Sequence, residues 1–147
     1  MRKKPSPLGI QASACPCGSG VVYADCCGRF HKGLPASTAE QLMRARYSAY
    51  VLYDNAFIAA TWHVTTRETG MPIDRGVPTE SGAPDIRWLG LDIRSHVASD
   101  DTASVEFVAR YKQGGRADRL HEISRFVREA GLWWYIDGRF PKEEKQP

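Results

Sequence analysis

All four cysteines of this 147-residue chain lie within thirteen positions, in the stretch CPCGSGVVYADCC that begins at Cys15. A Cys-x-Cys pair and a Cys-Cys pair at the two ends of a short loop can close around one metal ion, and thiolates are soft ligands that suit zinc. Zinc takes four sulfur ligands tetrahedrally, at Zn–S distances of about 2.3 Å. We therefore expect Cys15, Cys17, Cys26 and Cys27 to bind one zinc ion, in a zinc knuckle over residues 14–31.

A redox thiol pair, an iron–sulfur site, disulfides and unliganded cysteines are the alternatives. The neighbours Cys26 and Cys27 bridge each other poorly because a relaxed disulfide prefers a longer backbone separation, and a reducing compartment disfavours disulfides in general. A catalytic zinc ion keeps one position open for water, whereas four sulfurs close its coordination shell. We therefore expect a structural zinc site, with His31 as the nearby substitute if one cysteine does not bind.

The ends and the charge of the chain exclude several classes of protein. The basic start MRKKPSPLGIQASA lacks the apolar run of a secretory signal, and no stretch reaches the roughly 20 apolar residues of a membrane span. We expect a cytoplasmic protein that does not associate with membranes, with a flexible tail over residues 1–13. The formal net charge is only +3, and the basic residues are scattered along the chain, which argues against a nucleic-acid partner.

The elements that must carry any further site follow the cysteines. Ser37 and Glu40 make a capping-box pattern ahead of TAEQLMRARYSAYVLYDN, in which Leu42, Ala45 and Ala49 have helical spacing. NAFIAATWH predicts a second, shorter helix. Residues 64–85, rich in Pro, Gly, Thr and Asp, are predicted to form a loop.

From position 85 the hydrophobic period changes to two, which is typical of strands. Four strands are predicted around IRWLGLDIRSHVA, ASVEFVARYKQ, RLHEISRFVREA and LWWYIDGRF, with turn signals between them. In the first of these, strict alternation places Arg87, Leu89, Leu91 and Ile93 on one face. Helices followed by an antiparallel meander predict an α+β domain over residues 36–141.

Two resemblances add to this interpretation. CPCGSGxxYxxCCG resembles the SEC-C motif, a small zinc-binding module found at the C-terminus of the translocase ATPase SecA. SecA-type modules often carry lysines that are linked to SecB and ribosome binding, whereas this segment reads VVYAD. The rest of the chain is similar to the YchJ family, through stretches such as LMRARYSAYVLYDNAFIAATWH and LHEISRFVREAGLWWYIDG. That resemblance implies a cone of helices and a curved antiparallel sheet, of the nuclear-transport-factor-two-like (NTF2-like) or cystatin-like kind.

The cone could hold general acid–base chemistry, for which the candidate residues are Glu122, His63 and His121. On the strand that contains LHEISRF, Glu122 and Ser124 share one face and His121 and Arg125 the other, and the sequence leaves open which face points inward. We favour a structural role for these groups, as a satisfied polar network.

The sequence therefore favours a non-enzymatic zinc-binding protein. In this hypothesis the knuckle is a structural or protein-interaction element, and the cone accepts a small molecule. The alternative is a small hydrolase or isomerase that uses the cone pocket. The oligomeric state is open.

Overall fold

The computed structural model describes residues 12–67 and 86–141. Most of the predicted tail and of the predicted loop therefore lies outside the described residues. The elements, in chain order, are the 3-10 helix η1 (Tyr23–Asp25), the helices α2 (Cys27–His31), α3 (Ala39–Val51) and α4 (Asn55–Ala60), and the strands β1 (Ile86–Ser99), β2 (Thr102–Gln113), β3 (Arg116–Glu129) and β4 (Leu132–Arg139). The predicted α+β architecture is confirmed.

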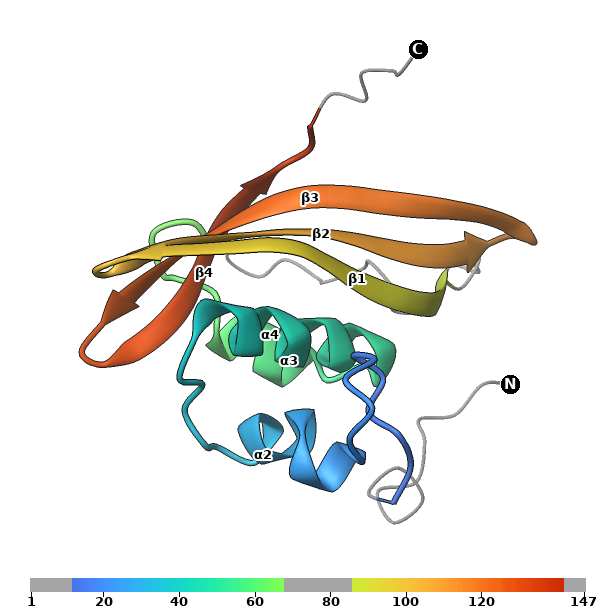
Figure 1. The fold of residues 1–147 in the computed structure, drawn as a ribbon, viewed down its shortest axis with the longest axis horizontal. Coiled ribbons are helices and arrows are strands. Elements are labelled where there is room, and N and C mark those ends of the chain that lie inside the picture. The colour runs from blue at the N-terminus through green and yellow to red at the C-terminus, as the bar shows by residue number, and fades with distance from the viewer. Residues whose placement is uncertain (1–11, 68–85, 142–147) are drawn as a thin grey trace.

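The molecule is built in three layers, with α3 and α4 in the middle (Figure 1). The curved sheet covers one side of these two helices, and the cysteine-rich segment with α2 covers the other side. Helix α3 is consequently buried on more than one face. Leu42, Ala45 and Ala49 are buried as their helical spacing predicts, and so are the polar side chains of Arg46 and Ser48.

The start of α3 differs from the predicted capping box by one position. Thr38, rather than Ser37, is the N-cap, and its Oγ1 atom accepts a hydrogen bond of 3.1 Å from the amide of Gln41. The side chain of Gln41 reaches back, and its Oε1 atom accepts from the amide of Ser37 at 2.7 Å. Glu40 instead lies beside Arg44, one helical turn further on. Thr38 and Gln41 have the same three-residue spacing as Ser37 and Glu40, so the spacing alone does not distinguish the two pairs.

The four strands form an antiparallel meander in the order β1-β2-β3-β4. Both central residues of the Gly114–Gly115 turn have positive φ, as do Ala130 and Gly131, and this backbone geometry matches the twist of the flanking strands. Strand β4 is also tied to the end of α4, since the Tyr135 amide donates to Thr61 and its carbonyl accepts from the His63 amide.

The predicted alternation along β1 is wrong at its beginning. Register shifts between Trp88 and Gly90, and between Ile93 and Ser95, insert extra residues into the strand. As a result Trp88 turns inward, where its ring lies 5.8 Å from that of Tyr47, and Leu89 is 49% exposed. A bulge of this kind shifts the facing of every residue before it, which a period of two cannot reveal.

A single hydrophobic cluster runs through all three layers. It contains Cys15, Cys17, Tyr23 and Phe30 from the cysteine-rich layer, together with residues of α3 and of the sheet. The knuckle and the cone domain therefore share one core. None of the described helices has the length and apolar character needed to cross a membrane.

Candidate functional site

The four cysteines are held by a short hairpin and by the start of α2. The Cys15 amide donates to the Val21 carbonyl at 2.9 Å, and residues 14 and 22 form an isolated bridge. The turn between them needs positive φ at Gly18 and Gly20, where glycine is favoured because it has no Cβ. Gly28 is required for another reason, since a Cβ there would lie only 2.7 Å from the Tyr23 carbonyl oxygen.

The sulfur atoms of Cys15, Cys17, Cys26 and Cys27 all lie within 4.8 Å of one another. All four cysteines are free, and the Sγ atoms of Cys17 and Cys26 are 3.7 Å apart. Sulfurs placed tetrahedrally about 2.3 Å from a common centre are separated by about 3.8 Å. The cluster thus has the dimensions of a four-thiolate metal site, and three of its four cysteines are buried.

The electrostatics of the cluster favour a cation. Hydrogen bonds from Cys17 and Cys27 lower the pKa of Cys15 far below its ordinary value. Hydrogen bonding to Cys15 and Cys17, together with burial, raises the pKa of Cys27. The Cys15 thiolate therefore forms readily, whereas the neighbouring Cys27 resists ionisation. A divalent cation would remove that conflict because it stabilises every thiolate at once.

Two residues of α3 support the cluster and were not found by sequence reasoning. The Oγ atom of Ser48, which is fully buried, lies 3.5 Å from the Sγ atom of Cys15. The Nη1 atom of Arg44 donates to the Cys17 carbonyl at 3.0 Å. Both lie more than twenty residues from their partners along the chain. Ordinary helix patterning gives no signal for them, because their roles depend on how the knuckle packs against α3.

His31 turns away from the sulfur cluster and links the knuckle to α3. Its Nε2 atom lies 2.8 Å from the Ala45 carbonyl oxygen, which can only accept, so Nε2 carries the proton. Its Nδ1 atom lies 2.6 Å from the hydroxyl of Tyr23, which donates to it. Burial lowers the pKa of His31 and raises that of Tyr23 to about 12, so both groups are neutral.

The first of the two possible faces of β3 points into the cone. Glu122 is 6% exposed, and its Oε2 atom accepts hydrogen bonds from the Ser124 hydroxyl at 2.9 Å and the Tyr135 hydroxyl at 3.2 Å. Burial raises the pKa of Tyr135, so its hydroxyl stays protonated and acts as a donor.

A buried arginine lies close to this carboxylate group. The Nη1 atom of Arg46 donates to the Ile58 carbonyl and to Thr61, and its guanidinium carbon lies 4.3 Å from the centre of the Tyr135 ring. Burial lowers the pKa of Arg46, and the nearby Tyr50, Tyr135 and Glu122 oppose that shift. Arginine and carboxylate together form a polar cluster inside the cone.

The two candidate histidines lie elsewhere. His121 is on the opposite face of β3, where its Nε2 atom lies 2.7 Å from Glu106. His63 follows α4, and its ring nitrogens lie 2.8 Å from the Thr65 hydroxyl and 3.0 Å from the Glu129 carboxylate. The structure therefore brings Glu122 together with Ser124 and Tyr135, and places each histidine beside a different glutamate.

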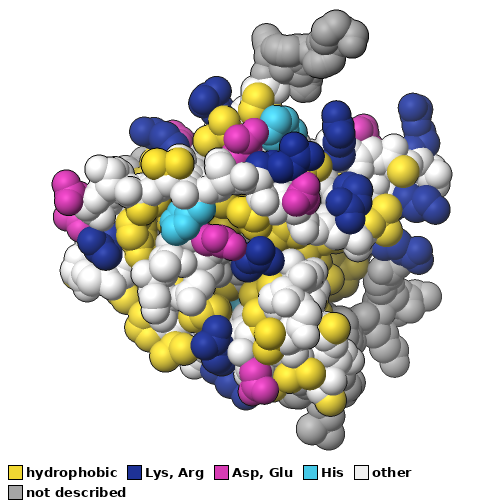
Figure 2. All heavy atoms as spheres, in the orientation of Figure 1, with side chains coloured by type: hydrophobic (Ala, Val, Ile, Leu, Met, Phe, Trp, Pro, Cys, Tyr) yellow, Lys and Arg dark blue, Asp and Glu magenta, His cyan; other side chains and the backbone are white. Residues whose placement is uncertain are grey.

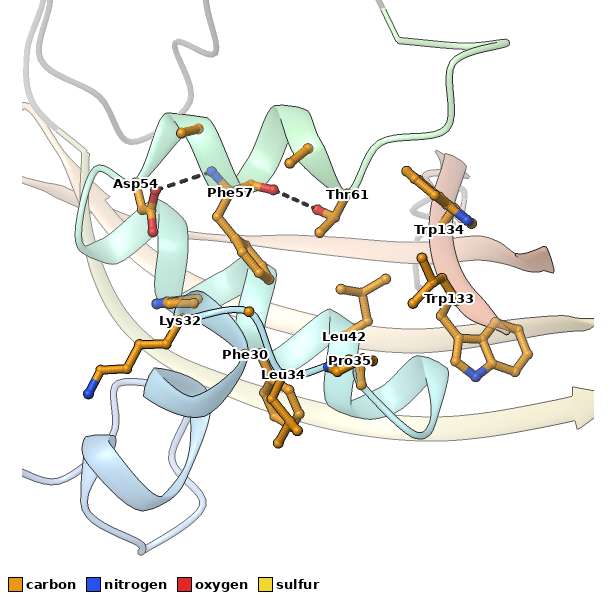
Figure 3. A pocket seen from close by; sticks show the side chains of 16 residues that line it. Phe30, Lys32, Leu34, Pro35, Leu42, Asp54, Phe57, Thr61, Trp133 and Trp134 are labelled. Carbon is orange, nitrogen blue, oxygen red and sulfur yellow. Dashed lines mark hydrogen bonds between the residues drawn. The ribbon is translucent and has the colours of Figure 1, made fainter. Parts of the chain in front are cut away.

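A groove of about 450 Å³ opens outside the cone, between the segment that follows α2, helix α4 and the start of β4 (Figure 3). Its walls are mainly apolar, with Phe30, Phe57 and Trp133 among them. Lys32 and Asp54 lie on the side of the groove away from the tryptophans. The shape and lining suit an apolar group. Sequence patterns gave no signal for the groove because its walls come from four separate segments of the chain.

These features define a class of protein: an α+β cone domain that carries a four-cysteine knuckle with the geometry of a metal site. Two family models match the chain, the SEC-C motif over residues 13–29 and the YchJ middle NTF2-like domain over residues 38–138. The chain belongs to the family of the YchJ NTF2-like domain, and the curated relatives that it matches are named UPF0225 proteins.

Similar proteins match nearly the whole chain. A UPF0225 protein of Ralstonia nicotianae is 54% identical over 90% of this chain and 94% of its own length, and one of Bordetella parapertussis is 49% identical over 94% and 98%. The solution structure of a SEC-C motif-containing protein from Rhodopseudomonas palustris has a TM-score of 0.74 and 33% identity, covering 86% of this chain and 97% of that one. A crystal structure of a SEC-C motif-containing protein from Psychrobacter arcticus has a TM-score of 0.71 and 28% identity, covering 94% and 86%.

Proposed function

We propose that this chain is a zinc-binding protein in which Cys15, Cys17, Cys26 and Cys27 hold one structural Zn²⁺ ion. The observation that carries the proposal is the approach of all four sulfur atoms to within 4.8 Å of one another. Four thiolates complete a tetrahedral shell, so the ion would have no open position for water and would act in folding rather than in catalysis. The match to the SEC-C motif over residues 13–29 supports this assignment.

The second part of the proposal is that the knuckle binds a protein partner through its outer surface. Val21 and Val22 are 43% and 39% exposed, so two adjacent apolar side chains lie on the surface of the knuckle. Together with Asp25, which is also exposed, they replace the lysines of SecA-type modules. An apolar contact surface with one acidic residue fits a partner with exposed aliphatic side chains.

Metal analysis of the purified chain tests the first part. We expect one zinc per chain, and a Cys26→Ser variant should hold its zinc more weakly because one thiolate is lost. A preparation that folds without metal, or that contains iron and sulfide, would refute a structural zinc site.

Capture from a bacterial lysate with Val21→Asp tests the second part, with Val64→Asp as the matched control. Val64 is 69% exposed and lies after α4, outside the knuckle. We expect Val21→Asp to lose a partner that wild type and the control both retain, while all three keep their zinc. The same partner list for all three would count against binding through the knuckle.

A second candidate function uses the cone interior, as a site for a small molecule or for hydrolase or isomerase chemistry. The buried carboxylate of Glu122, with Tyr135 and Ser124 as donors, favours it. In a screen for hydrolase and isomerase activity, Glu122→Gln should abolish any activity found. Glu106→Gln, the same change on the outer face, should leave it intact. Equal activity in both variants would exclude Glu122 from the chemistry.

A further inference from the structure

The register of the sheet gathers four basic side chains on its outer face, at the end where β1 begins and β2 ends. Arg87 lies directly opposite Lys112, and Arg110 lies opposite Arg119. Arg110 and Lys112 are two residues apart on β2, so they share a face, and their cross-strand partners share it too. We name Arg87, Arg110, Lys112 and Arg119 the basic tetrad.

Several other charges of the sheet are paired, whereas the tetrad is not within the part of the chain that the structure describes. Farther along the sheet, cations lie beside carboxylates, as in Arg94 with Asp92, Arg125 with Asp137 and Arg128 with Asp101. None of the tetrad side chains makes an ion pair within residues 12–67 and 86–141. All four are exposed.

Like charges placed directly opposite each other destabilise a sheet. Three adjacent strands span about 10 Å, so four positive charges occupy a patch of that width. The Arg110 guanidinium lies so close to the backbone of Gly90 that a Cβ at that position would overlap it. Figure 2 shows Lys and Arg side chains gathered over this end of the sheet, with few acidic side chains among them. A ligand with closely spaced negative charges would stabilise this arrangement.

The chemistry of the tetrad favours phosphate over carboxylate. Arginine presents a planar fork that matches phosphate oxygens, and three of the four members are arginines. An extended acidic peptide offers one side chain per face about every 7 Å, so few carboxylates reach a 10 Å patch. A DNA duplex, in contrast, carries one phosphate charge per about 1.7 Å of its axis, so its charges are spaced much more closely than those of the peptide.

The aromatic residues at this end of the sheet argue against single-stranded nucleic acid as the ligand. Trp88 and Tyr111 lie opposite each other on the inner face, with ring centres 5.6 Å apart, and Trp88 also packs against Tyr47. They are therefore turned away from the tetrad and cannot stack with bases there. We propose that the basic tetrad binds the phosphate backbone of a nucleic-acid duplex without reading its sequence.

Fluorescence anisotropy with labelled 20-base-pair RNA and DNA duplexes tests this proposal, using the full zinc-loaded chain. Four phosphate contacts predict that the affinity falls about 150-fold between 50 and 200 mM salt, because each contact adds about 0.9 to the slope. Arg110→Gln with Arg119→Gln should halve the slope, so the affinity falls only about 12-fold. The double variant should also bind more weakly than wild type at 50 mM salt.

The matched control is Lys32→Gln with Arg139→Gln, which removes the same charge from two exposed side chains outside the tetrad. It should keep the wild-type affinity and slope. The proposal is overturned if wild type does not bind either duplex at 50 mM salt, or if the control loses as much affinity as the tetrad variant. Tighter binding of poly-glutamate than of duplex would overturn it as well, in favour of an acidic protein.

Discussion

The Sγ atom of Cys15 lies 3.5 Å from the Oγ atom of Ser48, so the sulfur cluster touches the buried central helix α3 directly. Arg44 of the same helix holds the carbonyl of Cys17. The knuckle therefore packs as one layer against the helices of the cone domain. Loss of the proposed zinc ion is expected to affect the whole fold.

Removal of zinc by a chelator should lower the melting temperature of the entire protein in one transition. Structural zinc contributes several kcal/mol or more to folding, and in a domain of this size each kcal/mol shifts the melting temperature by about 2–4 °C. We expect a decrease of at least about 10 °C in circular dichroism, reversed when zinc is added back. A cone that melts at an unchanged temperature after chelation would contradict the shared core.

Ser48→Ala should weaken both folding and metal binding. The loss of its hydrogen bond to Cys15 should destabilise the protein by about 1 kcal/mol and reduce zinc affinity about 10-fold. Ser124→Ala is the control, because Ser124 is equally buried but bonds to Glu122. It should lower the free energy of unfolding by a similar amount without changing zinc affinity in a competition titration. Equal zinc affinity in the Ser48 and Ser124 variants would show that Ser48 does not support the site.

The contacts of His31 predict acid sensitivity. Burial lowers its pKa below the ordinary value of 6.5, so the folded state holds fewer protons on this ring than the unfolded state does. The stability that the neutral ring contributes is therefore complete above about pH 6.5 and declines as the pH falls below it. Urea unfolding at pH 7.5 and pH 5.5 should show this decline.

Metal binding by cysteines is itself pH-dependent, so a variant is needed to isolate the contribution of His31. His31→Gln keeps a donor for the Ala45 carbonyl but has no titrating ring, and it retains all four cysteines. Its stability should change less than that of wild type between the two pH values. The same pH dependence in both proteins would assign the effect to the thiolates alone.

Two strand glycines should respond very differently to alanine. A Cβ at Gly138 would overlap the carboxylate of Glu122, which is buried and held by Ser124 and Tyr135. Gly138→Ala should therefore cost about 2 kcal/mol or more. A Cβ at Gly90 would overlap only the guanidinium of Arg110, which is exposed and can move, so Gly90→Ala should stay within about 0.5 kcal/mol. Chemical denaturation of both variants checks this, and equal losses would show that the Glu122 carboxylate is free to shift.

Much of the fold could be predicted because its signals are local. The helical spacing of Leu42, Ala45 and Ala49 predicts the buried face of α3, and the turn residues Gly114 and Gly115 predict where two strands meet. The first part of β1 could not be predicted, since the bulge that exposes Leu89 arises from pairing with β2. Of the site, the cysteines could be named but their support by Ser48 could not.

The sequence by itself determined the cysteine set, the α+β class and the order of the elements, because each depends on residues close together in the chain. Only the tertiary structure decided which face of β3 carries Glu122 into the cone, and that Ser48 meets Cys15. It also decided that basic residues scattered along the chain, such as Arg87 and Lys112, lie opposite each other. The physical reason is that strand register and layer packing set the contacts between distant residues, and a one-residue shift in register reverses the face of every side chain.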